Sequence, residues 1–412
     1  MAMSKARLPV RAEDISLTRR VAAFAFILLG YIFYSYAWNT IDVLRPYIRA
    51  SAGLTLTEAG LLYSFQSAGA LVGAVVVGQM ADRFGRRNLL AAITLGYGVA
   101  LLAGVFAHDF VSLAAQRLVL GIFLGGVFAV AVGLYVGLFD AQVRGRLASI
   151  VGATFGLGLA LQGWLGGFYL DNDWTVMLWA GAVPPIVLAL FTFVVIPDDR
   201  HVIPYGGAPE APVITSKMPA RELFAPEHRR TTLLLTLLSG LGFLGYQGFS
   251  GWVTTFLKDV RGFSGADMGA LIAWQAVGGI LGGFFWGWVA DRFGRRAGIL
   301  GFVIGSAIII AYLRAPAVPA LLGTLGAAYG FVMSSGIAWG PYFTELYPSH
   351  LRSTAASVFH WGRIIGFLAP AITVAVADVV GLTAAMMMAA LVYLAAALVW
   401  WLLPETLVRR RA

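Results

Sequence analysis

The decapeptide GQMADRFGRR occupies residues 78–87, and a near copy, GWVADRFGRR, occupies residues 287–296. The two copies begin about half of the 412-residue chain length apart, so each lies at the same place in its own half. A repeat on this scale indicates duplication of a whole structural unit rather than of a short motif. The sequence therefore predicts two similar halves.

Outside these decapeptides charge is scarce and apolar residues are abundant. Hydrophobic residues make up 59% of the chain and charged residues 12%, against roughly 45–50% and 25% in ordinary soluble domains. Apolar stretches of about 20 residues, the length of helix that crosses a bilayer core, recur throughout. The composition predicts an all-α membrane protein in the lipid bilayer and leaves no soluble domain large enough for an enzyme.

The apolar stretches fall into two sets of six, separated by a polar segment rich in proline and charge. We expect twelve transmembrane helices, at about 21–47, 56–80, 88–107, 111–139, 146–169, 174–196, 231–258, 266–290, 297–313, 317–345, 352–378 and 382–403. The predicted organisation is a cytosolic N-terminal tail (1–20), a first six-helix half (21–196), a cytosolic linker (197–230), a second six-helix half (231–403) and a cytosolic C-terminal tail (404–412).

The distribution of lysine and arginine predicts the orientation in the membrane. Most of the 29 Lys and Arg residues fall in the tails, the linker and the loops on their side. Short cytoplasmic loops retain such residues, so we expect both termini in the cytoplasm of a cell with a bacterial-type inner membrane. The net charge of +9 is therefore mainly a topology signal, and we expect no nucleic-acid partner. The first 20 residues do not resemble a cleavable signal peptide.

Several kinds of chemistry are excluded by what the sequence lacks. It contains no cysteine, which excludes disulfides and thiolate metal sites. It contains no G-x-x-x-x-G-K-[ST] loop, so ATP-driven transport has no support. We expect no cofactor and no metal. The 50 glycines include clusters at 156–167 and 278–287, which are typical of closely packed membrane helices.

Two six-helix halves joined by a linker, each carrying the loop signature G-x-x-x-D-R-x-G-R-R, resemble the major facilitator superfamily. The resemblance covers the whole chain and points to the branch of metabolite:proton and aromatic-acid:proton symporters. It implies the major facilitator fold, with the substrate site between the halves at mid-membrane.

The resemblance also implies that the decapeptides belong to a cytoplasmic gate. The segments YVGLFDAQVRGRLAS (135–149) and YFTELYPSHLRSTAAS (342–357) form a second repeated pair, each with an acidic residue ahead of an arginine. In the family, charges of this kind latch the cytoplasmic ends of the two halves when the cavity faces outward. The gate residues so implied are Asp82, Arg83, Arg86, Arg144, Asp291, Arg292, Arg295, Glu345 and Arg352.

Arg363 is expected near the middle of the eleventh span, about 15 Å deep by the helical rise. An ionisable residue at that depth is a functional candidate, and a guanidinium suits a carboxylate through paired hydrogen bonds. The surrounding FHWGRIIGFLAP (359–370) resembles the G-R-x-x-G pattern of organic-acid carriers, in which this arginine attracts the anion. The alternative is an interhelical strut bonded to backbone carbonyls.

Asp42 in the first span and Arg117 in the fourth are expected at similar depth. RLVLGIFLGG (117–126) matches the family pattern R-x-x-x-G-x-x-x-G, and NTID (39–42) partly matches the D-G-[FY]-D of the acid symporters. The resemblance implies that Asp42 pairs with Arg117 and carries the proton. The competing interpretation is a static ion pair with Arg45, on the same helix face.

Polar and aromatic residues of the spans that line the cavity in this family, with a few of their neighbours, are pocket candidates. Aromatic walls suit a flat ring. Besides Arg363, the candidates are Tyr31, Tyr34, Trp38, Gln162, Tyr246, Gln247, Ser335, Trp339 and His360.

The function predicted from all this is proton-coupled symport of a small organic anion, most simply a monocarboxylate with or without an aromatic ring, by a monomeric carrier. A proton-coupled sugar or polyol symporter is the first alternative, because ELYPSHLR (345–352) and PET (404–406) also occur in sugar porters. A drug or organic-cation exporter is the second, and a non-transporting receptor is the third.

Overall fold

The computed structural model describes residues 10–206, 219–348 and 351–407. Among the described residues, twelve helical segments are long and apolar enough to cross a membrane, which confirms the predicted all-α class. The first half contains β1 (Val10–Arg11), η1 (Ala12–Asp14), α1 (Leu17–Ser51), α2 (Leu56–Phe84), α3 (Arg86–Ala103), η2 (Gly104–Phe106), α4 (Phe110–Gly125), α5 (Val127–Leu138), α6 (Ala141–Tyr169), α7 (Thr175–Val195), η3 (Asp199–His201) and β2 (Val202–Ile203).

The second half follows the same plan with more interruptions. It contains α8 (Pro219–Glu222), α9 (Arg229–Phe249), η4 (Ser250–Trp252), α10 (Val253–Thr255), η5 (Phe256–Val260), α11 (Gly265–Phe293), η6 (Arg295–Gly298), α12 (Ile299–Arg314), α13 (Pro319–Met333), η7 (Ser334–Ala338), α14 (Trp339–Glu345), α15 (Arg352–Trp361), α16 (Arg363–Gly366), α17 (Ala369–Val380) and α18 (Leu382–Trp401).

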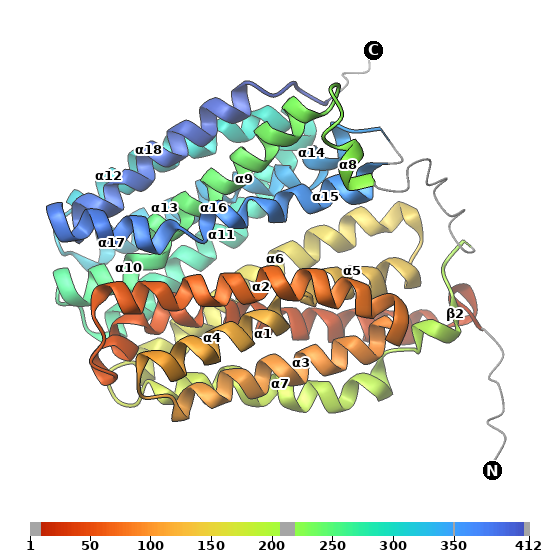
Figure 1. The fold of residues 1–412 in the computed structure, drawn as a ribbon, viewed down its shortest axis with the longest axis horizontal. Helices are drawn as coiled ribbons and strands as arrows, with labels where there is room; N and C mark the ends of the chain where they lie inside the picture. Colours follow the sequence, from red (N-terminus) through yellow and green to blue (C-terminus); the bar gives the residue numbers. More distant parts are fainter. Residues whose placement is uncertain (1–9, 207–218, 349–350, 408–412) are drawn as a thin grey trace.

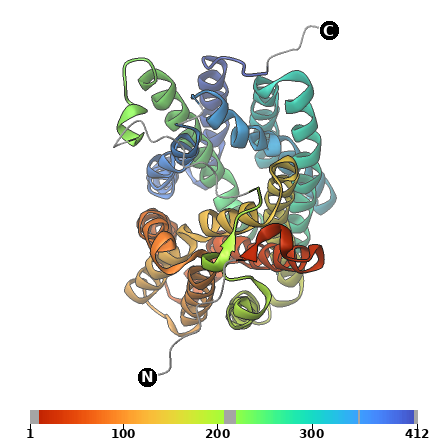
Figure 2. The same ribbon diagram turned by 90° about the vertical axis from the view of Figure 1, so that its right-hand side faces the viewer.

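The helices form two bundles, α1 to α7 and α9 to α18, that lie side by side (Figure 1). At one end α10 packs against α1 and α17 against α2, whereas at the other end the bundles diverge (Figure 1). Figure 2 looks onto the diverging end and shows α6 beside α11, the longest contact between the bundles. The two halves therefore meet along α6 and α11 and at one end only.

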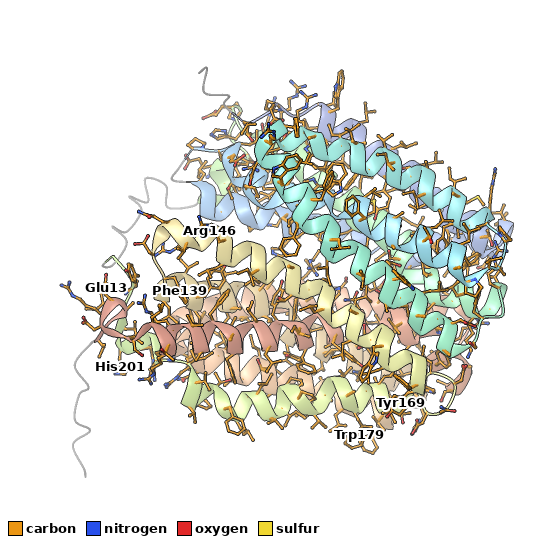
Figure 3. The ribbon with its side chains drawn as sticks, turned by 180° about the vertical axis from the view of Figure 1, so that it is seen from behind. Glu13, Phe139, Arg146, Tyr169, Trp179 and His201 are labelled. Carbon is orange, nitrogen blue, oxygen red and sulfur yellow. The ribbon has the colours of Figure 1, made fainter. Side chains whose placement is uncertain are left out.

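The diverging end carries both decapeptides and the described parts of the linker, 197–206 and 219–230, and we call it the linker end; the opposite end is the far end. Figure 3 shows Glu13, Phe139, Arg146 and His201 at the linker end, and Tyr169 and Trp179 toward the far end. At the linker end β1 pairs in parallel with β2, joining two segments that were predicted only as a tail and a linker.

Several spans are broken, which the hydropathy pattern did not predict. The fourth is interrupted between α4 and α5 at Gly126, and the eleventh is interrupted between α15 and α16 at Gly362. The seventh and tenth contain 3-10 segments, η4 and η7. Irregular backbone inside a membrane protein is stable where protein or a cavity surrounds it. These breaks therefore mark the interior rather than the lipid face.

Glycines allow α2 and α4 to approach closely. A Cβ atom on Gly121 would overlap the backbone carbonyl oxygen of Gln66, and one on Gly125 would overlap that of Ala70. Small residues of this kind let membrane helices pack backbone to backbone, where lipid provides no hydrophobic drive for association. The spacing R-x-x-x-G-x-x-x-G thus places Arg117 on the face of α4 that is pressed against α2.

We predict that Gly121→Ala lowers the thermal stability of the purified protein, although alanine favours helix formation. The added methyl group forces α2 and α4 apart, at a cost of about 1–3 kcal/mol for such overpacking. Gly30→Ala is the matched control, because no atom lies within 4 Å of a Cβ at that position. Equal unfolding temperatures for the two variants in detergent would contradict the proposed packing.

Candidate functional site

A cavity of about 590 Å³ lies between the two bundles and is mostly walled by aromatic rings. The predicted substrate-binding residues that line it are Tyr31, Tyr34, Trp38, Tyr246, Trp339, His360 and Arg363. Both halves contribute to this lining. A cavity between two halves of a carrier is where a substrate can be reached from either side.

A second cavity, of about 670 Å³, adjoins the first and shares Phe155, Tyr246 and Phe359 with it. Its lining follows α11 down to Asp291, in the decapeptide at the linker end. The two cavities together form a passage from the middle of the molecule to the linker end.

Arg363 is held at the cavity by the break in the eleventh span. Gly362 sits so close to α9 that a Cβ there would overlap the Ser239 hydroxyl group, and Arg363 starts the next short helix. The guanidinium carbon lies 4.4 Å from the centroid of the Trp38 ring and 5.1 Å from that of Phe243. The first ring belongs to the opposite half, so the contact joins the halves at the cavity.

Within the described part of the chain, Arg363 has no carboxylate partner and no hydrogen bond to a backbone carbonyl. Its buried Nε atom has no hydrogen-bond partner at all. The guanidinium interacts with the side chain of Tyr34. The strut interpretation, which requires bonds to carbonyl oxygens, therefore has no support in the described contacts.

The aromatic walls extend the site around this cation. Tyr31 and Tyr34 lie with their ring centroids 5.0 Å apart, and His360 meets Phe128 edge to face at 6.2 Å. Trp339 presents an indole Nε1 that is buried without a partner. The cavity thus offers flat apolar surfaces, one cation and few neutral hydrogen-bonding groups.

Three predicted substrate-binding residues lie outside the lining of this cavity. Gln162 joins α6 to α1, donating to the carbonyl oxygen of Tyr36 at 2.9 Å. Gln247 donates to the Asp42 carboxylate at 3.1 Å. Ser335 packs against α12, where a Cβ on Gly301 would overlap it. These three residues were predicted from their residue type and span number, but they lie on helix faces that do not line this cavity.

The lining also includes residues that the sequence reasoning missed, among them several phenylalanines. Phe243 is the important one because it stacks on Arg363. Asn39 was noted only as part of a motif, and its side-chain oxygen accepts a hydrogen bond from Tyr246 at 3.2 Å. A phenylalanine on a cavity-lining span carries no signal beyond its place on the helix, so only the assembled fold identifies it.

Asp42 is buried between the halves and pairs with Arg45 at 2.9 Å. It also accepts the hydrogen bond from Gln247, and its backbone oxygen accepts one from Thr254 of the opposite half. The direct pair with Arg117 that the family resemblance implied is not formed. Arg45 lies one helical turn along the same face and takes that place.

Arg117 instead donates to the side-chain oxygen of Gln66 at 3.4 Å, a long hydrogen bond. Gln66 donates in turn to the carbonyl oxygen of Trp38 at 2.9 Å. Arg117 remains close enough for its charge to interact with Asp42. These residues form one buried network. Among the described residues, Asp42 is the carboxylate in this network.

Ion pairs at the far end hold the halves together. Arg49 binds Asp259 across the halves at 2.6 Å. Asp171 accepts a hydrogen bond from the backbone N–H of Gly265, at the start of α11, and lies 3.8 Å from the ammonium group of Lys258. The passage is therefore closed at the far end.

The gate residues of the second half form a network within that half. Arg295 binds Asp291 at 2.7 Å and Glu345 at 2.8 Å. The Glu405 carboxylate accepts hydrogen bonds from the backbone N–H groups of Arg295 and Arg296, both at 2.9 Å. Glu405 belongs to the PET segment, which therefore caps the start of η6.

The first half contains the same kind of carboxylate cap. Asp199 accepts hydrogen bonds from the backbone N–H groups of Arg86 and Arg87, at 2.7 and 3.0 Å. The sequence reasoning missed both caps, although IPDD (196–199) and LPET (403–406) follow the last span of each half. Each decapeptide is thus tied to the end of its own bundle.

The latch between halves that the resemblance implied is not formed by the described residues. Arg144 donates to the carbonyl oxygen of Phe139 within its own half, while Arg83 lies over Phe84 and Arg292 over Trp288. The side chains of Asp82 and Arg352 lie outside the described residues. Among the described residues, the ion pairs of the charged groups at this end lie within one half.

Comparison with known proteins agrees with the family resemblance seen in the sequence. The sequence model of the family described as Major Facilitator Superfamily matches residues 27–276 and 262–411. The gallate transporter of Pseudomonas putida is 26% identical over 395 residues, which cover 87% of this chain and 88% of that protein. The cis,cis-muconate transport protein of Acinetobacter baylyi is 26% identical, covering 84% and 85%. The niacin transporter NiaP of the same species is 28% identical, covering 83% and 84%.

Solved structures show the same fold. The nucleoside transporter NupG superposes with a TM-score of 0.76 at 13% identity, covering 93% of this chain and 99% of that one. A bacterial homologue of the human lysosomal transporter Spinster superposes with a TM-score of 0.72 at 19% identity, covering 94% and 97%.

We predict that Glu405→Gln destabilises the protein at neutral pH. Burial opposes ionisation of Glu405, but the backbone N–H groups of Leu407, Arg296 and Arg295 outweigh it and hold its pKa below the usual value of 4.5. A lowered pKa means that the stabilisation is present at neutral pH and is lost as the pH falls through that pKa.

The unfolding temperature of Glu405→Gln should therefore lie below that of the unchanged protein at pH 7, and the gap should narrow as the pH falls below about 4.5. Glu227→Gln, which replaces an exposed acidic residue, is the control. A gap that stays constant with pH would contradict a role for the charge of Glu405.

Proposed function

The chain belongs to the Major Facilitator Superfamily, and from that premise we propose that it is a proton-coupled symporter of a small organic anion. It is a multi-pass membrane transporter rather than an enzyme. The substrate class that we propose is monocarboxylates, with aromatic acids as the first to be tested.

One observation carries this proposal: the guanidinium of Arg363 lines the central cavity with no carboxylate partner among the described residues. The rings of Trp38 and Phe243 stack on it. A cation–π contact with a ring face uses no N–H hydrogen bond, and the planar N–H fork of a guanidinium matches a carboxylate. A cation placed in this way needs an anion, and a transported carboxylate supplies one.

The aromatic walls of the cavity and the names of the similar transporters support the proposed substrate class of monocarboxylates, aromatic acids first. Tyr31, Tyr34 and Trp339 provide flat surfaces that favour an aromatic ring. Gallate, cis,cis-muconate and niacin, which name the similar transporters, are all organic acids. A neutral sugar, the substrate of the first alternative, carries no negative charge to pair with Arg363.

We propose Asp42 as the proton carrier. It is a buried carboxylate at the boundary between the halves, and one of its hydrogen bonds comes from Gln247 of the opposite half. Movement of the halves would break that bond and change the surroundings of the carboxylate. Proton binding would then be linked to the alternating exposure of the cavity.

The orientation follows from the charge distribution, and we propose that the linker end faces the cytoplasm of a cell with an inner membrane. In that orientation the tails 1–20 and 404–412 and the linker 197–230 are cytosolic. The passage would be open to the cytoplasm and closed to the outside by the far-end ion pairs.

We predict that Arg363→Gln abolishes or severely weakens carboxylate binding. Loss of a charge-assisted hydrogen bond costs about 1.5–3 kcal/mol, which corresponds to roughly 10–100-fold in Kd. The measurement is a thermal-shift titration of the purified protein with gallate, niacin and 4-hydroxybenzoate, and with neutral polyols and amines. Arg314→Gln, at an exposed arginine, is the control. Carboxylate binding that survives Arg363→Gln would overturn the anion assignment.

We predict that Asp42→Asn stops accumulation against a gradient and preserves exchange. The amide has the shape of the acid but cannot carry a proton. Uptake of labelled 4-hydroxybenzoate into proteoliposomes should therefore lose its response to an imposed pH gradient, while counterflow continues. Proton-driven accumulation by Asp42→Asn would contradict the assignment.

A further inference from the structure

A line of side chains on α1 faces the opposite half: Trp38, Asp42 and Arg45. These positions follow the spacing i, i+4 and i+7, which places them on one helix face. Trp38 stacks on Arg363, Asp42 bonds to Gln247, and Arg45 lies 4.3 Å from the ring centroid of Trp252. Seven residues of helix place Arg45 about 10 Å beyond Trp38, toward the far end.

The cluster around Arg45 contains more positive than negative charge. Arg45 and Arg117 are 0% and 1% exposed, and Asp42, 5% exposed, is the carboxylate that faces them among the described residues. Asp42 is already bound to Arg45, and the described side-chain hydrogen bond of Arg117 goes to the neutral Gln66, which carries no charge to balance it. Two buried cations share one anion.

Several donor atoms in this cluster have nothing to bond. The Nε and Nη1 atoms of Arg45 and the Nε atom of Arg117 are buried without a hydrogen-bond partner. A buried charge is stable only when it is paired and its hydrogen bonds are satisfied. The unused donors and the excess charge point to the same missing component, an anion with several acceptor oxygens.

The residues that cover the cluster belong to the second half. Trp252 covers Arg45, and Gln247 and Thr254 bond to Asp42. Carriers of this kind expose their site alternately to the two sides by rocking of the halves. When the far end opens, these covers move away, and the two guanidinium groups face the entrance with one carboxylate between them.

We propose that Arg45 and Arg117 form a second anion site, which binds the carboxylate of the incoming substrate at the far end before Arg363 binds it. This inference rests on the proposed function. The two sites lie on one face of α1, about 10 Å apart along the helix. The outer site exists when the far end is open and is covered when it is closed.

Arg117→Gln tests the proposal, because Arg117 has no carboxylate partner among the described residues and its removal leaves no described acid unpaired. The protein is reconstituted with known orientation, and the KM for labelled 4-hydroxybenzoate is measured separately from each side. We expect the KM from the far end to rise about tenfold, as for one lost charge-assisted hydrogen bond, and the KM from the linker end to stay unchanged. Arg117→Lys, which keeps the charge, should restore most of the loss.

A rise of equal size from both sides, or no change from either, would overturn the proposal. The effect of chloride on transport is measured as a second part of the experiment. If chloride stimulates transport by the unchanged protein, and Arg117→Gln removes that stimulation with the KM for the carboxylate unaltered, the site binds an inorganic anion and the proposal is wrong.

Two further variants keep the test decisive. If Arg117→Gln does not fold, the double variant Asp42→Asn with Arg45→Met removes one acid together with its cation, and counterflow should show the same one-sided rise in KM. Arg363→Gln should lose transport of 4-hydroxybenzoate from both sides. Retained transport in that variant would refute the proposed function, whereas a symmetrical effect of Arg117→Gln would refute only the second site.

Discussion

The structure depends on the requirement that a charge inside a membrane protein finds its partners within the protein, because lipid offers none. Helix α1 meets this requirement with one face. Trp38 stacks on Arg363, Asp42 pairs with Arg45, and Arg45 lies against Trp252. The partners of this face come mostly from the opposite half, so these contacts exist only when the halves are together.

The dependence of these contacts on the opposite half explains how the molecule can work as a carrier. Contacts across the halves are concentrated at the far end and around the cavity, and the described charges at the linker end bond within their own half. Opening the far end would exchange protein partners for water and substrate. The interactions that close the passage are thus also those that a substrate or a proton can replace.

The repeated decapeptides show how duplication gives each bundle the same structural feature. Gly85 and Gly294 have positive φ values of 82° and 110°, a conformation that favours glycine. Just beyond each glycine, the exposed backbone N–H groups are capped by a carboxylate, Asp199 in one half and Glu405 in the other. Each cap ties the loop between two helices to the end of the last helix in its bundle.

The sequence alone determined the membrane-protein class and the twelve spans, and it predicted Arg363 deep within the eleventh span. Hydropathy, charge placement and helical rise are local properties that do not depend on the partner of a residue. Of the residues that line the central cavity the sequence identified seven, Arg363 among them, on spans chosen from the family resemblance, and it missed the rest.

The tertiary structure decided which groups meet. It assigned Arg45 rather than Arg117 to Asp42, turned Gln162 and Ser335 away from the cavity, and brought Phe243 onto Arg363. These outcomes depend on the rotation of each helix about its axis and on breaks such as that at Gly362. Packing against other helices sets both, and no single stretch of sequence contains that information.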